Sequence, residues 1–387
     1  MSGFDELKNY VEIDTQKFRL IEDLLNSSKM EMQMLQCKEL EMPFDFDEDY
    51  VEDSDYSEEK KFSLKEISLP HKFCPKCGQV FPADENFCPD CLVALKYISD
   101  KIDIKDIKTD STIRFEGAND YSDILTPDCF SLIDDFDFTM DDFNEILFSI
   151  RSQAFKNMDK LIKDNSIDLD DLYILDKVIL FAKSFADVEY KSFGETLGYF
   201  ELNRIYVDDR QSDSLQITTL IHELTHFLIK EIFSGTICKI LDCSKNKHIE
   251  SVVTYILNYS DLNRMIDEYA AHSVEGRFTV FGYQDYSSFI ALQGELDEEY
   301  VDMAKTIGNT FSIYIKDLLE GFLDWDVRSE IKDLFLSQTI DRPDYSQLKF
   351  ENCNKLSDEG FLKAIWLILS EIENADAKKV RDLELEF

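Results

Sequence analysis

Residues 222–226 read HELTH, an HExxH motif, and no other part of the chain is as well suited to chemistry. On a helix, residues four apart share one face, so His222 and His226 can bind the same metal ion. Glu223 then lies beside that metal, where it could act as general base for a bound water molecule. The motif therefore predicts a catalytic zinc ion with two histidine ligands.

The residues around the motif are mostly apolar and recur at helical spacing. They predict a helix from Ser214 to Ser234, with Gly235 as its stop. A helix that is apolar on most sides belongs at the centre of a domain. A lone buried histidine is commonly satisfied by hydrogen bonds, but two histidines with this spacing and the adjacent glutamate favour metal binding.

The third metal ligand has to come from another segment. The longer motif HExxHxxGxxH is absent, since isoleucines occupy the positions of its glycine and its last histidine. The stretch DEYAAH, residues 267–272, supplies the best candidate, Glu268, on a helix whose small residues permit close packing against the HExxH helix. Asp267 and Glu250 are lesser candidates.

On these motifs the chain resembles the zincin metallopeptidases whose third ligand is a glutamate (gluzincin-like). The DEYAAH stretch is similar to the third-ligand helix of ImmA/IrrE-type peptidases, and the resemblance covers roughly residues 140–280. It implies that His222, His226 and Glu268 bind zinc, and that Glu223 passes a proton from water to the leaving amine. It also implies that residues 201–209, ELNRIYVDD, contain the strand that pairs with substrate.

The chain departs from this pattern at one position. Thermolysin-like relatives often carry an aspartate four residues after the glutamate ligand, where it orients the first histidine. This chain has His272 there, which could orient His222, replace Glu268 as ligand, or simply pack. His272 and Tyr269 are also candidate donors to the oxyanion of the reaction, although no fixed spacing identifies either.

Four cysteines form a second motif, C-x2-C-x10-C-x2-C, made of Cys74, Cys77, Cys88 and Cys91. Two such pairs place four thiolates at the corners of a tetrahedron, which suits Zn²⁺. The module resembles the small zinc ribbons, and a site closed by four cysteines has a structural role. A redox dithiol or an iron–sulfur cluster is the competing interpretation, which the duplicated pair disfavours.

Cys238, Cys243 and His248 follow the HExxH helix and raise the alternative of a further metal site. The group lacks an evident fourth ligand, and its spacing matches no familiar site.

The composition of the chain limits which classes of partner and which cellular compartment we expect. The 387 residues carry a formal net charge of −39, which repels nucleic acid and attracts basic protein surfaces. The start of the chain lacks a signal-peptide pattern, and no apolar run is long enough to cross a membrane. The odd total of nine cysteines argues against a disulfide framework. We therefore expect a cytoplasmic protein without nucleic-acid or membrane partners.

The predicted fold class is α+β, with a zincin-like core, a small zinc ribbon and a mainly helical C-terminal region. The expected order is a helical N-terminal arm (1–42), an acidic flexible linker (43–70), the zinc ribbon (71–95), an acidic connecting segment (96–138), the catalytic core (139–285) and a helical C-terminal region (286–387). The acidic linker could instead dock on a basic partner or cover the active site.

Together these features predict a zinc metallopeptidase that hydrolyses a protein or peptide substrate. The ribbon and the acidic arm would serve substrate selection or autoinhibition. The first alternative is a non-catalytic zinc-binding protein that docks on a basic protein partner. A DNA-associated protease is the second, and the charge of the chain opposes it.

Overall fold

The structure is a computed structural model that describes residues 71–119, 138–279, 291–337 and 355–387, apart from short gaps at 75–76, 78, 83–84, 93–94, 98–102, 110, 193–195 and 295. The predicted N-terminal arm and acidic linker lie outside these residues. The chain divides into two compact units, one containing the cysteine module and one containing the residues from Asp103 onward. The predicted α+β class is confirmed, because most described residues are helical and each unit holds a small sheet.

The cysteine unit contains a three-stranded antiparallel sheet in the order β2-β1-β3. The strands are β1 (His71–Phe73), β2 (Val80–Pro82) and β3 (Lys96–Tyr97). Strands this short bury little apolar surface, so a metal ion at the cysteines would add to the stability of the described part of this unit.

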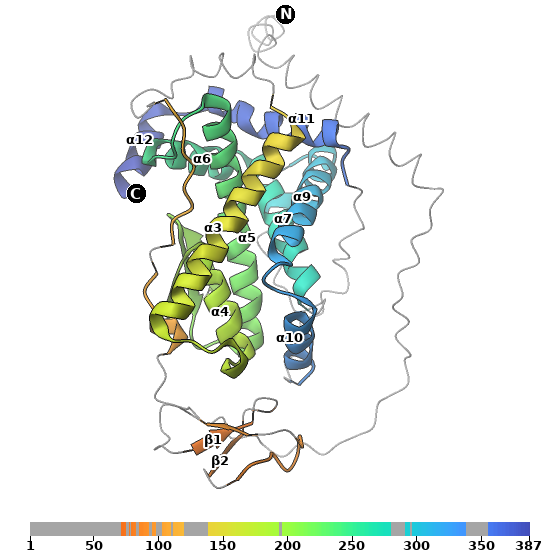
Figure 1. The fold of residues 1–387 in the computed structure, drawn as a ribbon. Helices are drawn as coiled ribbons and strands as arrows, with labels where there is room; N and C mark the ends of the chain where they lie inside the picture. The colour runs from red at the N-terminus through yellow and green to blue at the C-terminus, as the bar shows by residue number, and fades with distance from the viewer. Residues whose placement is uncertain are drawn as a thin grey trace, which may run out of the picture. The chain divides into compact units, whose positions relative to one another are not determined.

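The described part of the larger unit is mainly helical (Figure 1). Its helices are η2 (Ile104–Asp106), α3 (Met140–Asn165), η3 (Leu169–Asp171), α4 (Ile174–Phe185), α5 (Asp213–Leu241), α6 (Lys247–Tyr259), α7 (Asp261–Phe278), α9 (Glu298–Leu319), α10 (Trp325–Ser337), α11 (Asp358–Leu369), η4 (Ser370–Asn374) and α12 (Ala377–Glu386).

The sheet of this unit has the order β4-β6-β5. Strand β6 (Arg204–Asp208) lies in the middle, parallel to β4 (Asp187–Lys191) and antiparallel to β5 (Gly198–Glu201). The β5–β6 turn places Leu202 and Asn203 at φ 46° and 66°. Left-handed backbone at both central positions matches the right-handed twist of a two-residue hairpin.

Helix α5 is the central element, and it contacts α3, α4, α6 and α7 as well as the sheet (Figure 1). It runs past Gly235, so the predicted stop is wrong. The physical reason is packing: a Cβ at Gly235 would lie 2.7 Å from Ile146 and 2.8 Å from Phe115. The glycine permits close approach of neighbouring segments, and the helix ends at Asp242 in left-handed conformation instead.

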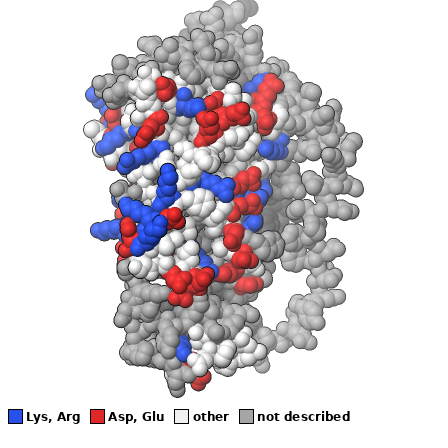
Figure 2. Space-filling model, viewed as in Figure 1, with Lys and Arg blue, Asp and Glu red and all other residues white. Residues whose placement is uncertain are grey.

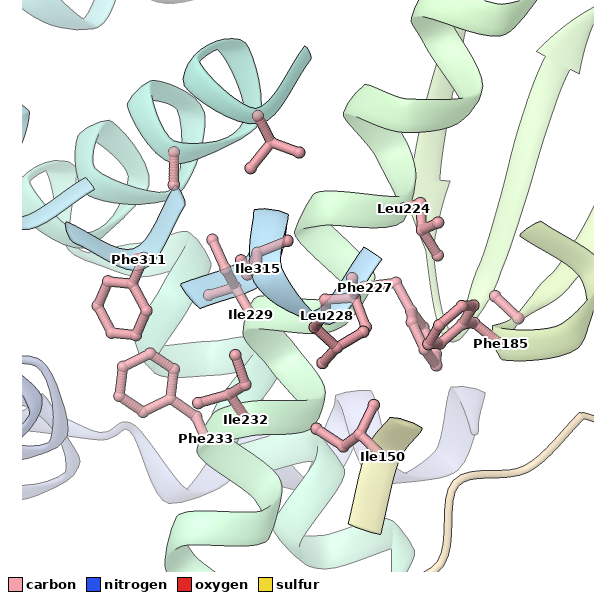
Figure 3. Packing of buried hydrophobic residues seen from close by; sticks show 14 of the residues in the cluster. Ile150, Phe185, Leu224, Phe227, Leu228, Ile229, Ile232, Phe233, Phe311 and Ile315 are labelled. Atoms are coloured by element: carbon pink, nitrogen blue, oxygen red, sulfur yellow. The ribbon is translucent and has the colours of Figure 1, made fainter. Parts of the chain in front are cut away.

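One hydrophobic core surrounds α5 (Figure 3). Leu224, Leu228 and Ile232 of α5 are fully buried within it, and Phe311 and Ile315 of α9 belong to the same cluster. The core thus extends from α5 into the C-terminal helices, which pack as part of the unit that holds the HExxH motif.

The segment before α3 also packs into this core. Ile104, Ile107 and Ile113 are buried. Lys183 of α4, 1% exposed, donates hydrogen bonds to the main-chain oxygens of Lys105, Ile107 and Val188. This part of the predicted connecting segment therefore helps to build the core.

None of the described helices combines the length and the apolar character needed to cross a bilayer. Figure 2 shows lysine and arginine side chains interspersed with acidic ones on the face that it presents.

Candidate metal sites and the cleft beside the HExxH motif

His222, His226 and Glu268 converge as the sequence predicted. The Nε2 atoms of His222 and His226 are 3.1 Å apart, and Glu268 Oε2 lies 3.7 Å from His222 Nε2. These three donors form a group that could hold a metal ion. Donors on a tetrahedral zinc at bond lengths of about 2.0–2.1 Å lie about 3.3 Å apart, so the geometry fits.

Two further carboxylates lie within hydrogen-bond distance of the Nδ1 atoms of His222 and His226, on the side of each ring away from its Nε2 atom. Asp267 Oδ2 lies 2.8 Å from His226 Nδ1, and Glu275 Oε2 lies 3.1 Å from His222 Nδ1. A carboxylate that accepts the Nδ1 proton leaves the Nε2 lone pair free for a metal. Asp267 thus orients a ligand rather than serving as one, and sequence reasoning missed Glu275.

His272 packs against His222, with the two ring centroids 4.5 Å apart. The His272 side chain is buried, and its Nδ1 is 3.2 Å from Glu275 Oε2. Glu275 therefore contacts the rings of both His222 and His272. His222, His272 and Glu275 also form a group that could hold a metal ion. Tyr269 is buried, and neither it nor His272 lines the cleft described below, since neighbouring helical residues point in different directions.

Burial and charge set the titration of the group. Burial raises the pKa of the Glu223 carboxyl, which keeps it a better proton acceptor than an exposed glutamate. Burial disfavours charge on His226, but the Asp267 carboxylate more than offsets this and raises the pKa of His226 to about 9. Burial also opposes charge on Glu268, yet the neighbouring His222 and His226 hold the pKa of Glu268 well below its usual range.

A cleft of about 500 Å³ opens beside these residues. Glu223, His222, His226 and Glu268 line its floor, and strand β5 lines one side. Thr254, Leu257 and Asn258 of α6 and Leu383 and Glu386 of α12 contribute further walls.

The strand beside the cleft is β5, not β6. Strand β6 makes up most of the segment 201–209, but both its edges are paired, with β4 and with β5. It therefore cannot add a substrate strand, and this part of the sequence prediction is wrong.

Strand β5 presents main-chain groups to the cleft. Asp208 N donates to Leu197 O, so Leu197 faces β6, and residues 199 and 201 do so by the alternation of an antiparallel ladder. Gly198 and Phe200 then direct their N–H and C=O groups to the other edge. Such an edge can bind an extended peptide through main-chain hydrogen bonds.

Lys230 extends the line of His222 and His226 by one more turn and also lines the cleft. Its ammonium donates to Asn203 Oδ1 at the tip of the β5–β6 hairpin, while Asn203 Nδ2 donates to Glu250 Oε1. Glu250 also pairs with Lys245, 3.1 Å away, so it is not a metal ligand. The spacing of four from His226 could have identified Lys230 in the sequence.

The four cysteines of the ribbon motif come together in the other unit. Their sulfurs all lie within 4.8 Å of one another, and Cys77 Sγ and Cys88 Sγ are 3.7 Å apart. Sulfurs on a tetrahedral zinc at about 2.3 Å lie about 3.8 Å apart. The N–H groups of Cys77 and Cys91 lie 3.4 Å from Cys74 Sγ and Cys88 Sγ, as in a metal-binding knuckle.

Cys238, Cys243 and His248 do not form a site. Cys243 N donates to Cys238 O at 3.0 Å, and this closing turn of α5 brings the two buried cysteines together. His248 Nδ1 instead lies 3.3 Å from Glu384 of α12.

Comparison with protein-family models gave no match, and comparisons with curated proteins and with solved structures gave none either.

Proposed function

We propose that the protein is a zinc-dependent peptidase whose active site is built on His222, His226, Glu268 and Glu223. The observation that carries the proposal is the pairing of three convergent metal donors with a buried glutamate on one cleft. A zinc ion bound there would supply Lewis acidity, polarising both a water molecule and the substrate carbonyl.

The residues of the chain have separate roles in this reaction. Asp267 and Glu275 keep the histidines in the tautomer that presents Nε2. Glu223 accepts a proton from the attacking water at its carboxylate and delivers it to the nitrogen of the leaving amine. The outward N–H and C=O groups of Gly198 and Phe200 hold the peptide extended beside these groups.

The zincin-like fold belongs to the same proposal. A sheet edge beside the HExxH helix and a third ligand on a following helix support it. The four-cysteine module would hold a second, structural zinc, and it would serve substrate selection.

The test is cleavage of fluorescently labelled casein by the zinc-loaded protein and by a Glu223→Gln variant. We expect the variant to retain its zinc and to lose activity by at least about 100-fold, because the proton acceptor is gone. A Glu359→Gln variant, with the same change on the exposed surface of α11, controls for charge. Equal cleavage by Glu223→Gln would overturn the role of Glu223, and no cleavage by the zinc-loaded wild-type protein would favour the non-catalytic, partner-binding alternative.

A further inference from the structure

Lys230 is an unusual residue for the wall of a metal cleft. Its side chain is 2% exposed, and a buried ammonium is costly unless it is paired with a carboxylate. Among the described residues no carboxylate lies within ion-pair distance of Lys230, although Glu231 and Glu250 pair with Lys245 nearby. The hydrogen-bond partner of its ammonium is the neutral amide of Asn203.

The backbone around Asn203 keeps this arrangement in place. Asn203 and Leu202 both adopt the left-handed backbone of the two-residue β5–β6 hairpin, which fixes the point from which the Asn203 side chain extends. The Asn203 amide is held from its other side by Glu250, so its oxygen stays directed at Lys230.

A second polar group of the cleft lacks a partner. Thr254 of α6 lines the same cleft, and its hydroxyl is buried with no hydrogen-bond partner among the described residues. Buried polar groups in native proteins are usually satisfied, and an absent ligand is one explanation of an exception. The cleft therefore holds both a cation and a hydroxyl that a bound anion would satisfy.

We propose that Lys230, with Thr254 beside the same cleft, forms a subsite for a carboxylate of the substrate. The inference rests on the proposed peptidase function and names its substrate class: peptides that carry an acidic side chain or a C-terminal carboxylate near the scissile bond. Lys230 is four residues beyond His226, a rise of about 6 Å along the helix. An extended peptide covers this in about two residues, which sets the distance from carboxylate to scissile bond.

Residues of α12 close this end of the cleft. The Phe387 ring lies 4.3 Å from the Lys230 ammonium, and Leu383 and Glu386 line the cleft. Helix α12 packs on α6 through the buried Val380 and the partly buried Leu383. A bound carboxylate would take the place of the Phe387 ring over the ammonium.

The test is binding to the zinc-loaded Glu223→Gln protein, which keeps the metal ligands but does not cleave. The probes are labelled hexapeptide pools that contain either glutamate or glutamine at the third position, and the same pools with a free or an amidated C-terminus. We expect the carboxylate form to bind about 10-fold tighter or more in one of the two comparisons, since a charge-assisted hydrogen bond is added. The comparison that shows the preference identifies the source of the carboxylate.

Two further variants assign the preference to Lys230. In Glu223→Gln/Lys230→Met the preference should vanish, whereas in Glu223→Gln/Lys239→Met it should persist. Lys239 is a matched control, because it is on the same helix but pairs with Glu145 outside the cleft. Equal binding of all pools to Glu223→Gln, or a preference that survives Lys230→Met, would overturn the subsite.

The outcomes separate this subsite from the peptidase proposal. The wild-type protein could cleave the glutamate and glutamine pools at equal rates, and also the free and amidated pools at equal rates. That result would overturn the subsite but would still support the peptidase proposal. A carboxylate preference in binding, without any cleavage by the wild-type protein, would support the subsite and overturn the peptidase proposal.

Discussion

The carboxylates behind the two histidines decide whether the metal donors are preorganised. Asp267 and Glu275 accept the Nδ1 protons of His226 and His222, and each is itself mostly buried. Replacing either by its amide keeps the shape but removes the charge that supports the ligand.

We expect Asp267→Asn and Glu275→Gln each to weaken zinc binding at the HExxH site by about 10- to 100-fold. The measurement is competition with a chromogenic chelator, and Asp261→Asn, at the exposed start of the same helix, is the control. Unchanged zinc affinity in both variants would show that these carboxylates do not orient the ligands.

Lys230 should make the folded chain less stable at neutral pH than it would be without this charge. Burial lowers the pKa of Lys230 to about 8 from 10.5, so between these values the unfolded chain binds more protons than the folded one. The free energy of unfolding therefore rises with pH between about 8 and 10.5 through this group. Below pH 8 the destabilisation caused by the buried Lys230 ammonium is fully present.

The expected result is that Lys230→Met increases the free energy of unfolding at pH 7 by about 1–3 kcal/mol, and that this gain shrinks by pH 10. Urea unfolding at both pH values, with Lys239→Met for comparison, measures it. A loss of stability in Lys230→Met at pH 7 would mean that the ammonium contributes more to the fold than its burial costs. Retaining a destabilising lysine is consistent with a binding role.

At the scale of single residues, the sequence predicted the donors but not their supports. HExxH has a fixed spacing on one helix, and Glu268 lies in a helical stretch of small residues. Glu275 carries no signal of its own, since an acid seven residues from Glu268 is as common on exposed helices. Glu275 meets His222 only because α7 packs against α5, and the sequence pattern does not show this packing at the level of single residues.

At the scale of elements, α7 positions the third ligand, and α9 positions α7. Gly308 of α9 lies so close to α7 that a Cβ there would be 2.8 Å from Ile266 O and 3.1 Å from Ala270 N. The small residue Ala270 thus serves the contact with α9. The sequence predicted close packing of this helix against the HExxH helix, which is confirmed, but it did not predict the contact with α9.

A Gly308→Ala substitution should force α9 away from α7. We expect it to destabilise the larger unit by about 1–3 kcal/mol and to weaken zinc binding at Glu268, while the four-cysteine site is unaffected. Thermal unfolding and zinc content measure the two effects. Gly294→Ala, where the nearest atom is 3.4 Å away, should be close to neutral, and an equally neutral Gly308→Ala would contradict the packing argument.

The strands were harder to predict than the helices. For helix α5, the apolar periodicity predicted a helix, but the predicted end at Gly235 was wrong because this glycine serves close packing. The strand order could not be read from composition, because β5 and β6 have similar residues and only the pairing shows which of them has a free edge at the cleft.

At the scale of the whole molecule, the two candidate metal sites belong to two compact units. The larger unit has an extensive apolar core, whereas the described part of the cysteine unit has three short strands. In the proposed function, zinc at the four cysteines would stabilise the fold of its unit, and zinc at the HExxH site would take part in the reaction.

This division predicts separate effects of removing each site. Cys88→Ser should abolish zinc binding in the cysteine unit while the thermal unfolding of the larger unit stays within about 1 °C, since its core does not include that unit's residues. Differential scanning calorimetry measures this. A large shift in the unfolding of the larger unit would contradict the independence of the two units.

The measurement that tests the central claim most directly is the number of zinc ions per purified chain, by elemental mass spectrometry, in the wild-type protein and in a His222→Ala/His226→Ala variant. The proposed sites predict two zinc ions in the wild type and one in the variant, with the remaining ion lost when Cys88→Ser is added. One zinc ion in both proteins would show that the HExxH group does not hold a metal, and the peptidase proposal would fall with it.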